Sequence, residues 1–168
     1  MGCGAAIGVV EFFPSRLQDS GLIKSRGLSI SQSIVKMAKD ANMLASGKLV
    51  GFVLTTDYDK ARAFYEGKLG LAFVSLDQYA LVMSVGGHQI RIAKMPTVTP
   101  VQATVLGWEV DDIVPVVTWL RDRGVVLEKY PFAQDKEFGV WTTPGGDRVA
   151  WFKDPDGNIL SVSQHTKR

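Results

Sequence analysis

The sequence predicts an α+β fold made of two β-α-β-β-β modules, and three observations predict it. Two helical patterns of similar length, residues 57–70 and 112–124, each follow an apolar strand and end at a glycine. Strand-like runs follow each helix, and a glycine turn joins the last two runs of each half, at Gly86-Gly87 and at Asp156-Gly157. Two copies of one unit that cannot bury both of its faces alone are expected to pack as a pair.

The first module is expected to occupy residues 48–95. Strands are predicted at residues 48–55, 71–76, 79–85 and 88–94. The helix is predicted at residues 57–69, because its apolar positions fall on one side at Ala61, Phe64, Tyr65 and Leu69. Gly70 is expected to end this helix.

The second module is expected to occupy residues 102–165, after a linker at 95–101 that contains two prolines. A strand is predicted at residues 103–110. Asp111-Asp112 then supply an N-cap and an acidic charge at the start of a helix over 113–123. The remaining strands are predicted at 125–129, in a less regular stretch that includes 139–143, and at 148–153 and 158–164.

Residues 1–46 are predicted to form an N-terminal extension, separate from the domain at 47–168. Apolar residues at a helical spacing between Ser29 and Leu44 predict one helix there. Three interpretations stay open: an amphipathic helix that packs on the domain or on a partner, a loosely attached extension, or upstream sequence before a natural start at Met37 or Met43.

Composition excludes several classes of protein. The chain has 168 residues with 46% hydrophobic and 21% charged residues, as in an ordinary globular domain. The net charge of +2 and the absence of a basic run give no reason to expect nucleic acid as a partner. No apolar run reaches the roughly 20 residues of a membrane span, so a cytoplasmic location is expected. Open sheet edges lead us to expect a homodimer.

Four motifs resemble the vicinal oxygen chelate superfamily, the group of glyoxalases, bleomycin-resistance proteins and extradiol dioxygenases. They are the helix opening DYDKARAFY at residues 57–65, the Leu69-Gly70 stop, WEVDD at 108–112, and the terminal hairpin WFKDPDGNILSVSQ at 151–164. The resemblance covers about residues 48–164 and implies a glyoxalase-like fold, in which the paired modules form a curved mixed sheet around a cavity.

The resemblance also implies four metal-ligand positions on the first and last strands of the two halves. In this sequence those positions hold Val50, Arg91, Val105 and Ser161. Valine offers no lone pair, and the arginine cation repels a metal ion. We therefore expect neither a metal site nor another cofactor. His88 beside the glycine turn and His165 near the C-terminus are expected to be exposed.

A cavity lined by the strands remains as the predicted site. Residues in phase with the four former ligand positions are expected to point into it, because strand side chains alternate between faces. The predicted ligand-binding residues from this reasoning are Phe52, Gln89, Arg91, Ser161 and Ser163. Trp141 and Trp151 are also predicted to line the cavity, because aromatic side chains often line such sites. Glu109 is the predicted catalytic acid or base if burial raises its pKa, with an Arg91–Glu109 ion pair as the alternative. Trp108 and Trp119 are expected in the core.

These observations favour metal-free binding of a small organic molecule in the cavity. The net positive charge argues against a cationic ligand of the bleomycin type. The alternatives are a lyase, isomerase or dioxygenase of the same superfamily that does not use the usual metal site, or an interaction protein that uses the N-terminal helix.

Overall fold

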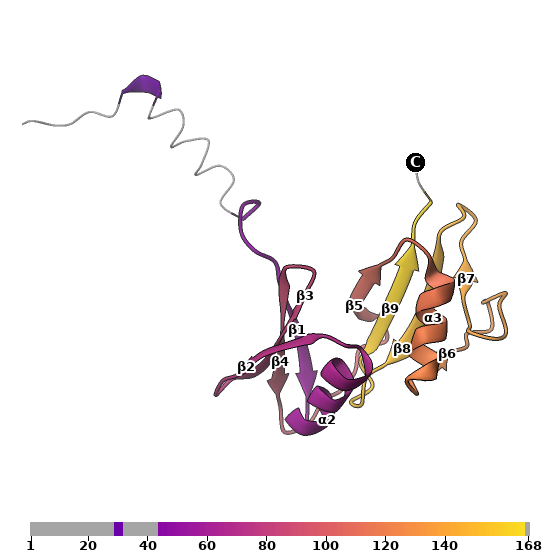
Figure 1. Cartoon of the computed structure of the whole chain (residues 1–168), viewed down its shortest axis with the longest axis horizontal. Coiled ribbons are helices and arrows are strands. Elements are labelled where there is room, and N and C mark those ends of the chain that lie inside the picture. Colours follow the sequence, from indigo (N-terminus) through magenta and orange to yellow (C-terminus); the bar gives the residue numbers. More distant parts are fainter. Residues whose placement is uncertain (1–28, 32–43, 167–168) are drawn as a thin grey trace, which may run out of the picture. The chain divides into compact units, whose positions relative to one another are not determined.

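The structure is a computed structural model that describes residues 29–31 and 44–166 (Figure 1). The chain divides into two compact units, Met1–Ser46 and Gly47–Arg168. Most of the helix predicted between Ser29 and Leu44 lies outside the described residues, although Ile30 and Ser31 are helical. No helix in the described ranges is long and apolar enough to cross a membrane.

The first module follows the predicted order closely (Figure 1). Its sheet has the order β1-β4-β3-β2, in which β1 lies parallel to β4 and the other pairs are antiparallel. Gly86 and Gly87 both have positive φ, as the two-residue turn between β3 and β4 requires. The elements are β1 (Val50–Thr55), α2 (Tyr58–Arg62), the helical segment η1 (Ala63–Lys68), β2 (Ala72–Leu76), β3 (Ala80–Val85) and β4 (His88–Lys94).

The first helix begins as predicted but widens in its second half. The Asp57 side chain accepts hydrogen bonds from the Asp59 and Lys60 backbone N–H groups and so caps α2. From Ala63 on, the turns are π-helical, and the Leu69 N–H donates to the Phe64 carbonyl at 2.9 Å. Gly67, which costs an α-helix about 1 kcal/mol relative to alanine, lies in this wider segment.

The second module repeats the arrangement with shorter outer strands. Its sheet has the order β5-β9-β8-β6, and β7 also pairs with β8. The Asp112 carboxylate caps α3 by accepting from the Val114 N–H, as predicted. The elements are β5 (Thr104–Glu109), α3 (Ile113–Asp122), β6 (Leu127–Glu128), β7 (Trp141–Thr142), β8 (Arg148–Lys153) and β9 (Ile159–Gln164). Two β-α-β-β-β modules in an α+β fold are thus confirmed.

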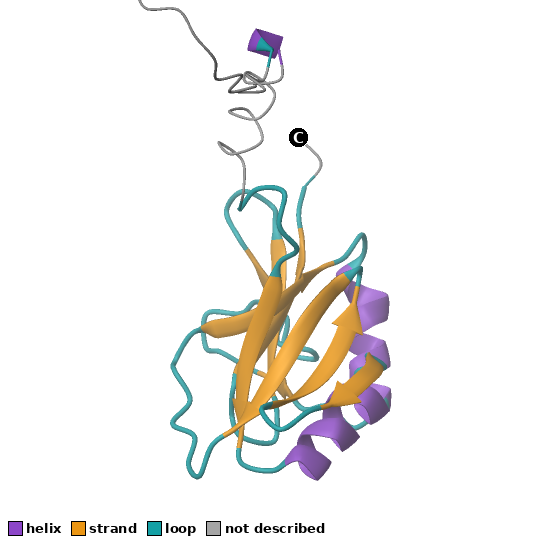
Figure 2. Ribbon diagram, turned by 90° about the vertical axis from the view of Figure 1, so that its left-hand side faces the viewer, coloured by secondary structure: helices purple, strands orange, loops and turns teal. Residues whose placement is uncertain are grey.

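One hydrophobic core serves both modules. Figure 2 shows the helices of residues 47–168 on one side of the strands. The buried apolar residues of these helices belong to the core. Phe64 and Tyr65 from the first helix and Val117 and Leu120 from α3 belong to the same cluster of buried side chains. Trp108 and Trp119 pack against this cluster, which confirms the prediction that both belong to the core.

The turn between β8 and β9 connects the two modules, and we call it the hairpin joint (Asp154, Asp156 and Asn158). The buried Asp154 carboxylate accepts a hydrogen bond from the Tyr65 hydroxyl at 2.8 Å. Asp156 accepts from the Thr55 hydroxyl at 2.6 Å, and the Asn158 side-chain amide donates to the Leu54 carbonyl at 2.8 Å. The terminal hairpin therefore holds both β1 and the first helix.

The Asp156 carboxylate should make the free energy of unfolding depend on pH in the acidic range. Burial alone raises the pKa of Asp156. The hydrogen bonds that Thr55 and Thr56 donate to its carboxylate lower the pKa by more, so in the folded state it lies below its usual value. The Asp156 carboxylate therefore contributes its full stabilisation above its pKa in the unfolded state, which is about 4. This contribution is lost as the pH falls through its lower pKa in the folded state. Asp156→Asn should be less stable than the wild type at pH 7. Urea unfolding should show that the difference in unfolding free energy between the two proteins becomes smaller below about pH 4.

The control for this prediction is Asp59→Asn, because the Asp59 carboxylate makes no hydrogen bond or ion pair with any described residue. A difference between Asp156→Asn and the wild type that stays constant from pH 7 to pH 2.5 would contradict the assignment.

Candidate functional site

Strand alternation gives each sheet a core face and an opposite face, which we call the open face. In β1, Val53 and Thr55 point into the core, whereas Phe52 is 65% exposed on the open face. The register of β1 and β4 places Phe52 beside Arg91 and Val50 beside Gln89. The structure therefore brings Phe52, Gln89 and Arg91 together on the open face of the first sheet.

Arg91 has an ion-pair partner that the sequence did not reveal. Its guanidinium lies 2.7 Å from the Asp77 carboxylate, just before β3. The Tyr79 and Ala80 backbone N–H groups and Arg91 all donate to Asp77; Tyr79 and then Arg91 lower its pKa most. The alternative of an Arg91–Glu109 ion pair was wrong, because a closer carboxylate within its own module pairs with Arg91.

The open face of the second sheet carries the other predicted residues in two adjacent rows. Ser161 lies between Gly107 on β5 and Trp151 on β8. In the next row Ser163 lies between Glu109 and Val149, and Val149 pairs in turn with Trp141 on β7. Trp141, Trp151, Ser161, Ser163 and Glu109 thus share one face of one sheet.

Four rings on this face form a continuous group that we call the aromatic cluster (Tyr130, Phe132, Trp141 and Trp151). The ring centroids of Trp141 and Trp151 are 6.2 Å apart with nearly parallel planes. Phe132 meets both tryptophans edge-on, and Tyr130 stacks on Phe132 at 5.3 Å. Sequence reasoning missed Tyr130 and Phe132, because they lie in the irregular segment between β6 and β7, where no periodicity indicates a face.

Polar groups border the aromatic cluster. The Trp151 indole N–H donates to the Thr104 hydroxyl at 3.2 Å. Thr104 reaches this face because a bulge interrupts the pairing of β5 with β9 between Thr104 and Leu106, which strict alternation did not predict. The Ser161 side chain is only 9% exposed, yet its hydroxyl makes no hydrogen bond to any described residue.

Gly107 makes room for that hydroxyl. A Cβ at position 107 would lie 2.8 Å from the Ser161 hydroxyl oxygen, too close for two non-bonded atoms. The absence of a side chain at Gly107 therefore leaves space for the Ser161 hydroxyl on this face, next to Trp151 in the strand pairing.

Glu109 occupies a more exposed position than acid–base catalysis of the predicted kind requires. Its side chain is exposed at the end of β5, and it borders a surface hollow together with Val110, Asp111 and His165. The burial on which the predicted pKa shift depended is therefore not present. Its role as a catalytic residue stays a prediction, with loss of turnover in Glu109→Gln as the test.

The side chains at the four family ligand positions do not fit a divalent metal ion. Val50 and Val105 have no donor atom, Arg91 is a cation already paired with Asp77, and Ser161 offers one neutral hydroxyl. Within residues 29–31 and 44–166, no group of three or more His, Cys, Asp or Glu side chains is placed to hold a metal. His88 and His165 are exposed, as predicted.

Comparison with known proteins agrees with this fold. Residues 48–162 match the model of the Glyoxalase/Bleomycin resistance protein/Dioxygenase superfamily. No curated protein matches the chain. Among solved structures, it resembles a superfamily member from Sphaerobacter thermophilus, with a TM-score of 0.56 and 21% identity over 71% of this chain and 98% of that one.

Two similar structures are named for a function. One is lactoylglutathione lyase from Agrobacterium tumefaciens, with a TM-score of 0.53 and 18% identity over 71% of this chain and 93% of that one. The other is the antibiotic-binding protein TnmS3 from Streptomyces sp. CB03234, with a TM-score of 0.56 and 24% identity over 72% of this chain and 97% of that one. With the family match over residues 48–162, the chain belongs to the glyoxalase, bleomycin-resistance and dioxygenase superfamily.

Proposed function

We propose that this protein binds a flat, uncharged organic molecule on the open face of its second sheet, without a metal ion. The observation that carries the proposal is the aromatic cluster, in which Trp141 and Trp151 are partly exposed in spite of their size. Aromatic rings favour stacking on other rings, and tryptophan supplies a large contact area at a low cost in side-chain entropy.

The polar groups beside the aromatic cluster favour a site for a specific ligand over a surface that binds apolar molecules in general. The Ser161 hydroxyl, which bonds to no described residue, lies next to Trp151 and can donate to a carbonyl or ether oxygen, or accept from a hydroxyl. Beside Trp151, the Glu128 carboxylate is paired with the Lys153 ammonium group at 2.9 Å, so these two charges balance each other. These contacts favour an uncharged ligand with one or two polar substituents.

The two similar structures that are named for a function are a lyase and an antibiotic-binding protein. The four ligand positions lack metal donors, which supports binding over metal-dependent turnover. A cytoplasmic homodimer fits this proposal. Phe52, Gln89 and Arg91 on the first sheet are proposed as further ligand contacts.

The test is a titration with phenazine, a flat uncharged ring system, in buffer that contains EDTA. Binding should quench tryptophan fluorescence, and Trp151→Ala should weaken the affinity about tenfold, as expected for the loss of about 1.4 kcal/mol of stacking. Tyr79→Ala, which removes an exposed ring from the first module, is the matched control and should leave the affinity unchanged.

Binding that Trp151→Ala leaves intact would exclude the aromatic cluster as the site. Binding that disappears with EDTA and returns with a divalent metal would show that the metal-free assignment is wrong.

A further inference from the structure

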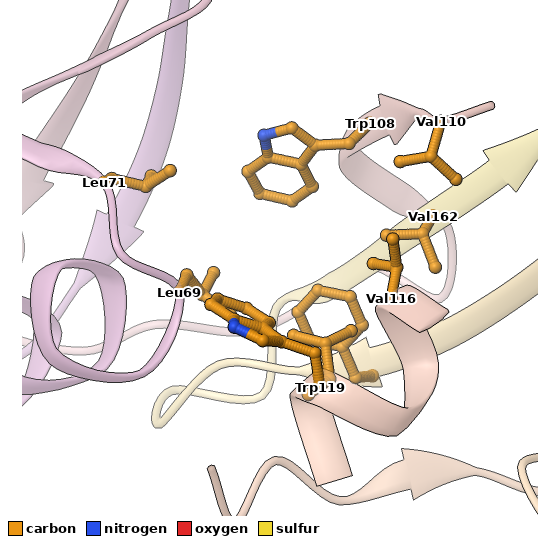
Figure 3. A pocket seen from close by; sticks show the side chains of 9 residues that line it. Leu69, Leu71, Trp108, Val110, Val116, Trp119 and Val162 are labelled. Atoms are coloured by element: carbon orange, nitrogen blue, oxygen red, sulfur yellow. The ribbon is translucent and has the colours of Figure 1, made fainter. Parts of the chain in front are cut away.

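A second cavity lies on the other side of the second sheet, between the end of the first module's helix and α3. Its volume is about 160 Å³, and its walls are almost wholly apolar. Figure 3 shows the indole rings of Trp108 and Trp119 extending from the second module toward Leu71 and Leu69 of the first. Val116 of α3 and Val162 of β9 form the wall behind the indoles.

We propose that this cavity is a binding site for one uncharged aromatic ring or a compact alkyl group of similar size. An apolar cavity of about 150 Å³ stays dry and binds benzene, because water inside it has too few hydrogen-bond partners. The present cavity has that volume, is partly open to solvent, and has no charged side chain among its lining residues. A ring therefore gains dispersion contacts on several sides, whereas a carboxylate or ammonium group would lose its hydration without compensation.

Contacts with other side chains hold the two indole rings of the cavity wall in place. The Arg123 guanidinium lies 3.9 Å from the centroid of the Trp119 ring, and the other end of this ring lies close to Gly70. The Trp108 ring stacks on Phe152 with 6.4 Å between centroids. Both indoles thus have packing partners that fix them at the edge of the cavity.

This cavity is separate from the aromatic cluster, although the same strands build both. Consecutive residues of a strand point to opposite faces, so Phe152 lines the cavity whereas Trp151 lies on the open face. On β9, Val162 lines the cavity whereas Ser161 lies on the open face. On β5, Trp108 lines the cavity whereas Gly107 lies on the open face. Occupants of the two sites therefore contact different tryptophans.

The four tryptophans allow a direct test with the full chain. Toluene is titrated into the protein, and the indole N–H signals are followed by nuclear magnetic resonance. We expect saturable shifts of the Trp108 and Trp119 signals and none of the Trp141 and Trp151 signals. Benzoate, which has a similar ring but a negative charge, is expected to produce no saturable shift.

Two variants on α3 distinguish the effect of filling the cavity from the general effect of adding a phenylalanine to this helix. Val116→Phe places a ring inside the cavity and should weaken toluene binding at least tenfold. Val114→Phe makes the same change at a position of α3 that is 43% exposed, and it should bind toluene like the wild type. If Val116→Phe does not fold, Val116→Leu takes its place and should weaken toluene binding severalfold.

Three results would overturn the proposal. They are the absence of saturable shifts up to the solubility limit of toluene, shifts confined to Trp141 and Trp151, and unchanged toluene affinity in a folded Val116→Phe variant. The second result would assign toluene to the aromatic cluster and leave the function proposed above intact.

Discussion

Replacing Asp154 with alanine should lower the free energy of unfolding by about 3–4 kcal/mol. The Asp154 side chain is 6% exposed and accepts four hydrogen bonds. The donors are the Tyr65 hydroxyl, the Asn158 backbone and side-chain N–H groups, and the Asp156 N–H. Alanine removes every acceptor at once. It leaves the buried Tyr65 hydroxyl and the Asn158 backbone N–H without their acceptor, whereas the Asn158 side-chain amide keeps its bond to the Leu54 carbonyl.

Tyr65 makes this loss especially costly. The ring is fully buried, and burial together with the Asp154 carboxylate raises the pKa of its hydroxyl far above the usual value. The hydroxyl therefore stays protonated and needs an acceptor at every accessible pH. In the alanine variant the carboxylate that accepts from this hydroxyl is gone.

Urea unfolding at pH 7, followed by tryptophan fluorescence, measures the effect. Tyr65→Phe keeps the carboxylate and removes only one hydrogen bond, so it should cost about 1–2 kcal/mol. Asp122→Ala removes an exposed carboxylate that pairs with Arg121 and should change stability by about 0.5 kcal/mol or less. An Asp154→Ala cost no larger than that of Asp122→Ala would show that the hairpin joint does not stabilise the fold.

Replacing Gly139 with alanine should also destabilise the protein, by about 3 kcal/mol or more. Gly139 has φ of +73°, and a Cβ there would overlap with the Glu128 carbonyl oxygen and lie 3.3 Å from the Lys129 Cα. These are backbone atoms at the end of β6, so they cannot rotate away as a side chain would. The segment between β6 and β7 must shift instead.

Gly86→Ala is the matched control for Gly139→Ala. Gly86 also has positive φ, at +54°, but nothing lies within 4 Å of its Cβ position, so only the backbone strain of about 1 kcal/mol is expected. Because Tyr130 and Phe132 lie on the displaced segment, near-ultraviolet circular dichroism should change in Gly139→Ala and stay unchanged in Gly86→Ala. Equal costs in the two variants would mean that the close approach to Glu128 is unimportant.

The sequence predicted the regular part of the fold because each strand and helix there has its own local pattern. The β8–β9 hairpin was predicted to within one residue, since Asp154-Pro155-Asp156-Gly157 gives a turn and apolar runs flank it. Gly70 and Gly124 end the two helices with positive φ, as their positions predicted. These features depend on neighbouring residues and can be read without knowledge of the tertiary structure.

The candidate site was harder to predict because tertiary packing decides it. Trp141 and Trp151 were predicted to line the cavity because aromatic side chains often line such sites, but Tyr130 and Phe132 reach them only through an irregular segment. Likewise, the pairing of Arg91 with Asp77 depends on the turn before β3, and the position of Thr104 depends on a bulge. None of these has a short-range pattern in the sequence.

The hairpin joint also has a consequence for how the chain folds. Its hydrogen bonds connect residues 89, 101 and 104 positions apart, so they form only after the whole second module has been synthesised and closed onto the first. Until then, Tyr65 has no partner for its hydroxyl. The first module therefore depends on the last hairpin for its native state, and the two repeats fold as one cooperative unit rather than as independent halves.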